Sequence, residues 1–279
     1  MRINQDTMTN RDFSTISSTA RSLLLMKGIA TSIPYLKEAA VLVVGHGAID
    51  FECRYLSIDR AVADSPVENF LEIASGFSFR SLDMTRERKC FYLDTDLPEV
   101  IETKASMAAE LMRAEDRSAE RSPHFLALNA LDTDQFSSAL SLFPPGPITV
   151  MNEGLLIYLD DAEKRRLCEI VRKALMDRGG SWVSGDIYVR KGSAAKARLL
   201  GPEARKFLAE HKVIENQFAD FDAAAEFFTQ CGFRFEAHTA DEVYEHLSSV
   251  NTLKRYQEVD EDEIRARLQT RQTWVLSAV

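Results

Sequence analysis

The sequence predicts an α/β fold built on a doubly wound sheet, and three observations carry this prediction. Short apolar runs bounded by turn residues alternate along the chain with segments of helical spacing, as in successive strand–helix units. The first complete unit, residues 67–98, reads as strand, small-residue turn, helix and strand with an acidic end. The last two apolar runs, 231–239 and 271–279, both read as strands, which predicts an antiparallel pair at one edge of the sheet.

The composition is that of an ordinary globular protein. Of the 279 residues, 45% are hydrophobic and 28% are charged, which suffices for one large α/β domain with added helical regions. The formal net charge of −9 argues against nonspecific nucleic-acid binding, which needs a basic surface. The first residues are polar and no apolar run approaches the roughly 20 residues that cross a bilayer, so we expect a cytoplasmic protein without a membrane partner.

The cysteines predict neither a zinc site nor a disulfide framework. They are dispersed along the chain without C-x-x-C spacing. We therefore expect buried free thiols and no bound metal. The residues concerned are Cys53, Cys90, Cys168 and Cys231.

The first strand and the turn after it carry the strongest signal for a ligand site. The apolar run at residues 70–74 is short and bounded by turn-forming residues, as in a buried parallel strand. Acidic and small residues occupy alternate positions from it into the turn, at Glu72, Ala74, Gly76 and Ser78. Small side chains let backbone amides approach a ligand, and the turn opens a helix toward it.

The second strand ends on acidic residues roughly 20 positions after the turn, where a carboxylate can accept both hydroxyls of a ribose. Either Asp94 or Asp96 suits this role. The turn has fewer glycines than the pyrophosphate of a dinucleotide requires, and its leading glutamate suits a cationic amino acid group. These features favour S-adenosylmethionine over NAD as the cofactor.

The remaining elements continue the alternation of strands and helices. Polar residues end two further strands, and the carboxyl ends of strands are where open α/β sheets bind ligands. The most secure helix runs between a capping box at Asp160 and Glu163 and a closing Gly179. The expected strands are 124–132, 148–151 and 181–187, the expected helices include 97–112 and 135–142, and the polar strand-end residues are Asn129, Asp132, Asn152 and Glu153.

Four regions are expected along the chain. Residues 1–66 form an N-terminal helical cap, 67–190 a cofactor-binding α/β core, 191–230 a helical lid inserted over the crevice, and 231–279 the C-terminal part of the sheet. The aromatic residues of the third region fit a lid that faces the crevice and fit ordinary core packing equally well. They are Phe218, Phe221, Phe227 and Phe228.

Five segments carry a resemblance to a known family: DFSTISSTARSLLL, FLEIASG, YLDTDLPEVI, ALNALD and NEGLLIYL. In order and spacing they resemble the leucine carboxyl methyltransferase-like superfamily of class I S-adenosylmethionine-dependent methyltransferases. The resemblance covers nearly the whole chain and is strongest to the bacterial small-molecule O-methyltransferases associated with polyketide metabolism.

The resemblance implies a Rossmann-like, seven-stranded sheet with helical additions over the active site. It implies that Asp96 binds the ribose, that Arg54 pairs with the cofactor carboxylate and that Glu153 lies beside the sulfonium and amino group. Asn129 and Ala130 fall where the family often has Asp-Leu near adenine. The turn residues Glu72, Ala74, Ser75 and Gly76 would hold the methionine part of the cofactor.

The expected reaction is an in-line transfer of the sulfonium methyl group to an oxygen of a small molecule, without a metal. A carboxylate acceptor needs no general base, whereas an alcohol or phenol needs one. Three side chains could act as this general base, namely His46, His124 and Tyr158. None of them has a sequence pattern that indicates a catalytic partner, so the catalytic residues are left unassigned. Two alternatives stay open, an NAD(P)-dependent oxidoreductase and a catalytically silent S-adenosylmethionine-binding protein. The sequence does not indicate the oligomeric state.

Overall fold

The computed structural model describes residues 46–63, 65–116, 121–190, 202–256 and 258–279. The first two-thirds of the expected N-terminal cap and the start of the expected lid therefore lie outside the described residues. The division into four regions stays a prediction.

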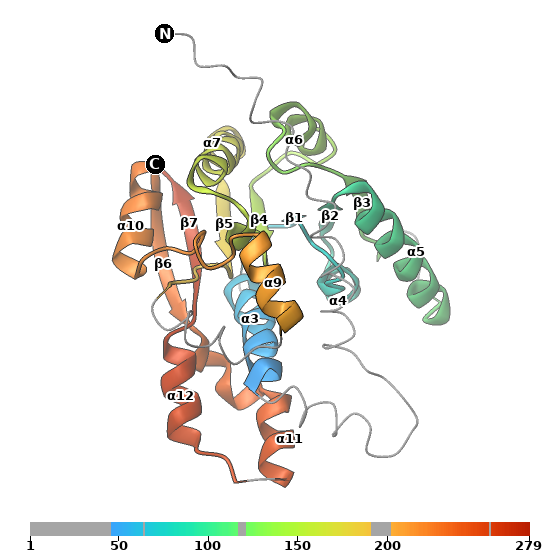
Figure 1. Cartoon of the computed structure of the whole chain (residues 1–279). Coiled ribbons are helices and arrows are strands. Elements are labelled where there is room, and N and C mark those ends of the chain that lie inside the picture. Colours follow the sequence, from blue (N-terminus) through green and yellow to red (C-terminus); the bar gives the residue numbers. More distant parts are fainter. Residues whose placement is uncertain (1–45, 64, 117–120, 191–201, 257) are drawn as a thin grey trace.

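A single mixed sheet forms the centre of the fold (Figure 1). Its seven strands lie in the order β3-β2-β1-β4-β5-β7-β6. The first five strands in the chain are parallel to one another, and β7 is antiparallel to both β5 and β6. The predicted antiparallel pair at one edge is confirmed. The strands are β1 (Asn69–Ile73), β2 (Phe91–Asp96), β3 (His124–Ala127), β4 (Ile148–Asn152), β5 (Gly180–Ser184), β6 (Phe233–Thr239) and β7 (Gln272–Ala278).

Helices cover both faces of the sheet because side chains of a strand alternate between the faces. Leu71 and Leu93 enter the larger core cluster together with α6 (Thr133–Leu140), α7 (Asp161–Arg178) and α10 (Phe221–Gln230). Their neighbours Phe70 and Tyr92 point to the opposite face, where they pack with Ile58 and Val62. The helices on this second face are α3 (His46–Ala63), α4 (Arg80–Glu87) and α5 (Pro98–Ala114).

Two strands end earlier than predicted, and at the third strand polar side chains turn the chain. The third strand stops at Ala127, after which Asn129 Oδ1 accepts from Leu131 N and Asp132 caps α6. The fifth strand stops at Ser184. The helix between Asp160 and Gly179 is confirmed, with the capping box formed in both directions.

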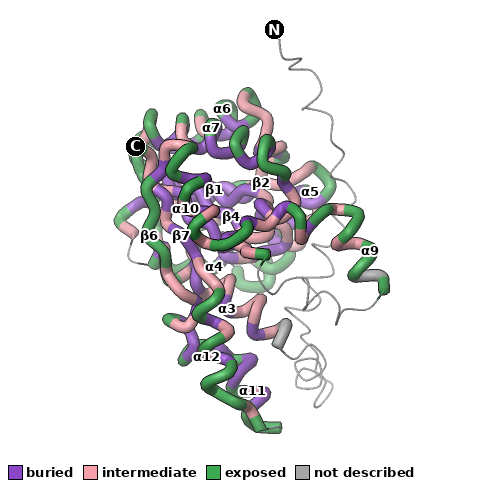
Figure 2. Tube along the Cα trace, turned by 60° about the vertical axis from the view of Figure 1, so that its left-hand side comes forward, coloured by how far each residue is buried: buried purple, intermediate pink, exposed green. Residues whose placement is uncertain are grey.

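A helical segment joins β6 to β7, and the sequence analysis did not anticipate it. It comprises η4 (Ala240–His246), α11 (Ser248–Tyr256) and α12 (Glu261–Gln269), and it packs on the first half of α3 through a cluster that includes Ile49 and Cys53. Figure 2 shows α11 and α12 beyond α3 at one end of the molecule. Asp50 pairs with Arg267 and Arg271, which ties this segment to α3.

The aromatic residues of the expected lid region lie largely in the main core. Phe218, Phe227 and Phe228 are buried with Trp182, and Phe221 packs against the same cluster. α10 therefore covers the sheet, whereas α9 (Pro202–Glu210) lies outside this layer with exposed and half-buried residues.

The four cysteines are free thiols, and Cys53 and Cys168 are buried. Within the described residues no helix has the length and apolar character needed to span a membrane. In the same part of the chain, no cluster of three or more His, Cys, Asp or Glu side chains is placed to hold a metal ion.

Cys231 is expected to be the thiol that alkylates fastest. A hydrogen bond with Cys168, together with the nearby Arg165 guanidinium, lowers the pKa of Cys231, whereas burial raises the pKa of Cys53 to about 12. Because the thiolate is the nucleophile, iodoacetamide at neutral pH should label Cys231 first. Peptide mass spectrometry over time measures the order, and Arg165→Gln should slow labelling. Faster labelling of any other cysteine would contradict this assignment.

Candidate functional site

The candidate site lies where the strand order reverses direction. β1 lies between β2 and β4, so the chain winds one way from β1 through β2 to β3 and the other way from β4 to β5. Open α/β sheets bind ligands outside the carboxyl ends of the strands at such a point. Glu153 follows β4 here, and the small-residue turn follows β1.

The turn after β1 keeps a backbone shape that glycine ordinarily provides. Ala74 and Gly76 have φ angles of 50° and 51°, in the left-handed region. A non-glycine residue adopts this conformation rarely, so the surrounding contacts hold Ala74 there. One of them is the Ser75 N–H, which donates to Thr95 O at 2.9 Å. Ala74 therefore adopts a backbone conformation that glycine ordinarily provides.

Asp96 fastens this turn to the end of β2. Its Oδ2 accepts from Gly76 N and its Oδ1 from Leu97 N, both at 2.7 Å. Burial raises the pKa of Asp96, and the two N–H donors oppose that rise. A carboxylate has about four acceptor positions, so two remain for a ligand's hydroxyl groups.

Asp94, the other candidate ribose ligand, exposes no surface to a ligand. Its side chain is fully buried and pairs at 2.8 Å with the equally buried Lys104 of α5. The same ammonium donates to Ser75 Oγ at 2.9 Å. The buried pair of Asp94 and Lys104 therefore stabilises the turn through Ser75.

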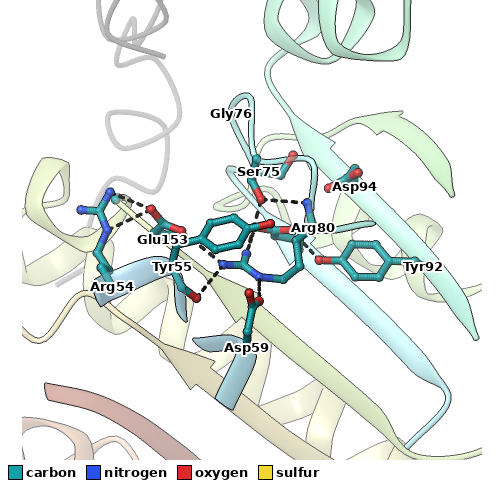
Figure 3. Close-up of polar contacts among 12 residues, drawn as sticks. Arg54, Tyr55, Asp59, Ser75, Gly76, Arg80, Tyr92, Asp94 and Glu153 are labelled. Atoms are coloured by element: carbon teal, nitrogen blue, oxygen red, sulfur yellow. Dashed lines mark hydrogen bonds and ion pairs between the residues drawn. The ribbon is translucent and has the colours of Figure 1, made fainter. Parts of the chain in front are cut away.

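Glu72 and Glu153 meet at a guanidinium that the sequence analysis overlooked (Figure 3). Arg80 Nη1 lies 2.6 Å from Glu72 Oε1, and Arg80 Nη2 lies 3.3 Å from Glu153 Oε2. Arg80 Nε also lies 2.6 Å from Asp59 Oδ1 on α3. The Tyr92 hydroxyl donates to the other oxygen of Glu72 at 2.5 Å.

Arg54 and Glu153 also pair directly, although 99 positions separate them in the chain. Arg54 Nε and Nη2 both donate to Glu153 Oε1, at 3.0 and 2.9 Å, and Nη1 donates to the Tyr188 hydroxyl at 2.5 Å. Burial opposes the charge of Arg54, but Tyr188 and Glu153 keep its pKa well above the ordinary value. The guanidinium of Arg54 therefore stays charged beside Glu153.

The loop that carries Glu153 is held by Asp186, a second residue without a local sequence signal. Its buried carboxylate accepts from the backbone N–H groups of Gly154, Leu155 and Leu156 and from Asn152 Nδ2. The donor–acceptor distances lie between 2.5 and 3.1 Å.

Asn129 and Ala130 lie on the loop after β3, one strand further along the same edge. Leu128 N donates to Asp96 O at 2.8 Å, which joins this loop to the end of β2. Asp132, the other candidate near adenine, uses its carboxylate to cap α6. Whether Asn129, Ala130 and the other predicted residues bind a ligand stays a prediction.

The candidate bases differ in their distance from this edge. His124 begins β3 and stacks on Phe91, so it lies at the amino end of the strand, away from the site. Tyr158 lies in η3 (Leu156–Tyr158), directly after the Glu153 loop, and packs edge-on against Phe207 and His211. The side chain of His46 lies outside the described residues.

Solved structures with this fold are known, although no protein-family model and no curated protein sequence matches the chain. A DUF574 family protein from Streptomyces avermitilis MA-4680 is 13% identical, with 93% of this chain and 96% of that chain covered and a TM-score of 0.61. Magnesium protoporphyrin IX methyltransferase from Synechocystis PCC 6803, with bound SAH, is 10% identical over 95% and 97% of the two chains, with a TM-score of 0.52. These likenesses confirm the predicted Rossmann-like, seven-stranded class I methyltransferase fold.

Proposed function

We propose that the protein is an S-adenosylmethionine-dependent methyltransferase. The observation that carries this proposal is the set of carboxylates at the carboxyl ends of three adjacent strands, beside a turn in left-handed conformation. Glu72 is the last residue but one of β1, Asp96 ends β2 and Glu153 follows β4 directly. S-adenosylmethionine presents an ammonium group and a ribose diol, and both are groups that carboxylates bind.

The charged residues along this edge of the sheet have the chemical character that the groups of this cofactor require. Asp96 retains acceptor positions for the two ribose hydroxyls. Glu153 would take the ammonium group and Arg54 the carboxylate, while the turn at Ala74 and Gly76 leaves backbone close to the ligand. The solved methyltransferase from Synechocystis holds SAH on the same fold, which supports this choice of ligand.

The methyl acceptor is proposed to be an oxygen of a small molecule. The resemblance to the leucine carboxyl methyltransferase-like superfamily supports a hydroxyl or carboxylate acceptor. S-adenosylmethionine supplies a methyl group on a sulfonium that a nucleophile can displace. The chain's own contribution is to hold cofactor and acceptor in line, and such alignment lowers the barrier by up to roughly 7 to 11 kcal/mol. Tyr158 is the described candidate base nearest this edge, should the acceptor be an alcohol or phenol.

Calorimetric titration with S-adenosylmethionine and S-adenosylhomocysteine tests this function. The wild type should bind both at micromolar concentrations, and Asp96→Ala should weaken binding at least about tenfold because each lost hydrogen bond to a charged group contributes about 1.5 to 3 kcal/mol. The exposed Asp177→Ala is the control and should leave the affinity unchanged. Absence of binding by folded wild-type protein would reject the proposal, and NADH fluorescence on titration would then test the oxidoreductase alternative.

A further inference from the structure

We infer that Arg80 is a positioning residue, which holds the Glu72 and Glu153 carboxylates in place for the cationic amino acid end of the donor. This inference rests on the proposed function and assigns a role to a residue at its centre. Arg80 itself is 1% exposed, so it acts through its neighbours.

The guanidinium of Arg80 joins four segments of the site (Figure 3). Its N–H groups form a rigid planar fork. Because every N–H group of the guanidinium has an acceptor, the fork fixes the relative positions of the segments that carry these acceptors. Those segments are α3, the end of β1, the turn after it and the end of β4. The acceptors are Asp59 Oδ1 at 2.6 Å, Glu72 Oε1 at 2.6 Å, Ser78 Oγ at 3.4 Å, and Tyr55 O and Glu153 Oε2 at 3.3 Å.

The two oxygens of Glu153 are held by different arginines. Oε1 accepts from Arg54, and Oε2 accepts from Arg80. The Arg54 side chain is 11% exposed, against 1% for Arg80. If Arg54 turns toward the carboxylate of a ligand, Arg80 still fixes Glu153. Arg54 is thus assigned to the ligand, and Arg80 is assigned to holding the carboxylates in place.

The cluster carries a charge that suits a cation. The carboxylates of Asp59, Glu72 and Glu153 face the guanidinium groups of Arg54 and Arg80, which leaves one negative charge. Burial opposes the charged form of Arg80, but Glu72 and Asp59 keep its pKa well above the ordinary value, so the guanidinium stays charged. An ammonium group beside Glu153 would neutralise the cluster.

The variant Arg80→Lys tests the inference because it keeps the charge and removes the fork. One ammonium cannot reach acceptors on four segments, so Glu72 and Glu153 should lose their fixed positions. We expect the affinity for S-adenosylmethionine to fall about tenfold, and that for 5′-methylthioadenosine, which lacks the amino acid end, to change less than about twofold. Arg86→Lys, on the exposed side of α4, is the matched control and should change neither.

The pH profile of binding gives a second readout that loss of stability alone would not move. The titratable and charged groups that face Arg80 are Asp59, Tyr55, Glu72, Tyr92 and Glu153. Arg80 opposes the rise that burial causes in the pKa of Asp59. Without the hydrogen bond from the guanidinium, Asp59 should protonate at higher pH, so the affinity of Arg80→Lys should fall more steeply than that of the wild type as the pH is lowered from 8 to 5.5.

The outcomes separate this inference from the proposed function. Wild-type protein that binds no S-adenosylmethionine rejects both. The positioning role alone is rejected if the wild type binds S-adenosylmethionine but Arg80→Lys loses no affinity. It is also rejected if Arg80→Lys loses the same affinity for S-adenosylmethionine and for 5′-methylthioadenosine. If Arg80→Lys does not fold, Asp59→Asn replaces it, because this side chain is 36% exposed and anchors Arg80 from α3. Asp59→Asn should weaken S-adenosylmethionine binding several-fold, and unchanged affinity would overturn the inference.

Discussion

Replacing Asp186 with alanine is expected to lower the free energy of unfolding by roughly 3 to 5 kcal/mol and to disorder the loop that carries Glu153. The buried carboxylate of Asp186 accepts four hydrogen bonds, three of them from consecutive backbone N–H groups and one from Asn152 Nδ2. Each buried N–H left without an acceptor costs about 1 to 3 kcal/mol, and water entering the gap recovers part of that cost. The loss therefore exceeds that of an ordinary surface substitution.

Urea denaturation followed by circular dichroism measures this change. Asp186→Asn should be intermediate, because the amide keeps one acceptor oxygen but turns an NH₂ group toward donors. Asp177→Ala, an exposed aspartate of α7, should change the free energy of unfolding by less than about 0.5 kcal/mol. A loss below about 1 kcal/mol for Asp186→Ala would contradict the role assigned to this carboxylate.

The predictable part of the fold is the part with local signals. The turn formers after residues 70–73, Pro98 at the start of α5 and the capping box of Asp160 and Glu163 each stand within a few positions of the element that they begin or end. Acidic residues at strand ends are also local features. The sequence therefore predicted that Glu72, Asp96 and Glu153 end or follow strands, and the sheet order brings them to one edge.

Arg80 and Asp186 were missed because their partners are distant in the sequence. Arg80 contacts Glu153 across 73 positions and Asp59 across 21, and Asp186 contacts Gly154 across 32. In the sequence Arg80 stands in the predicted helix after the turn, and Asp186 stands near the end of the predicted strand 181–187. Charged residues are typical of solvent-exposed positions. Only the fold shows that both are buried and that each organises a loop of the site.

The segment between β6 and β7 did carry local signals. Thr239 and Glu242 form a capping box at η4, and Asp260 caps α12 through Glu263 N. These residues fit the Ser/Thr/Asp-x-x-Glu pattern of helix starts. The two flanking strands were predicted, but no helix was assigned to the residues between them.

Replacing Lys104 with alanine is expected to lower the free energy of unfolding by about 3 to 5 kcal/mol near pH 8, because it leaves the Asp94 carboxylate buried without its partner. Both side chains of this pair are fully buried, 2.8 Å apart, beneath the turn of the site. Lys104 also donates to Ser75 Oγ, so the turn should become less ordered and cofactor binding should weaken together with stability.

The pH dependence of this effect has a definite sign. Burial raises the pKa of Asp94 to about 6, although Lys104 pulls it down, whereas an aspartate in the unfolded chain has a pKa of about 3.9. A carboxyl group whose pKa is raised on folding stabilises the fold below its unfolded pKa, and this contribution is lost as the pH rises through the folded value. Without Lys104 the folded pKa should rise further. The stability deficit of Lys104→Ala should therefore be small near pH 5, where Asp94 is protonated in the variant, and grow toward pH 8.

Urea denaturation of the wild type and Lys104→Ala at pH 5 and pH 8 measures this difference. In the double variant Asp94→Leu/Lys104→Met neither charge is buried, and apolar replacements of a buried pair are often neutral in stability. At pH 8 the double variant should recover most of the free energy of unfolding that Lys104→Ala loses. Its remaining deficit should not change with pH. The difference between the single and double variants gives the coupling energy between positions 94 and 104. An equal deficit for Lys104→Ala at both pH values would mean that packing of the lysine side chain, and not the unpaired Asp94 charge, is what the substitution removes.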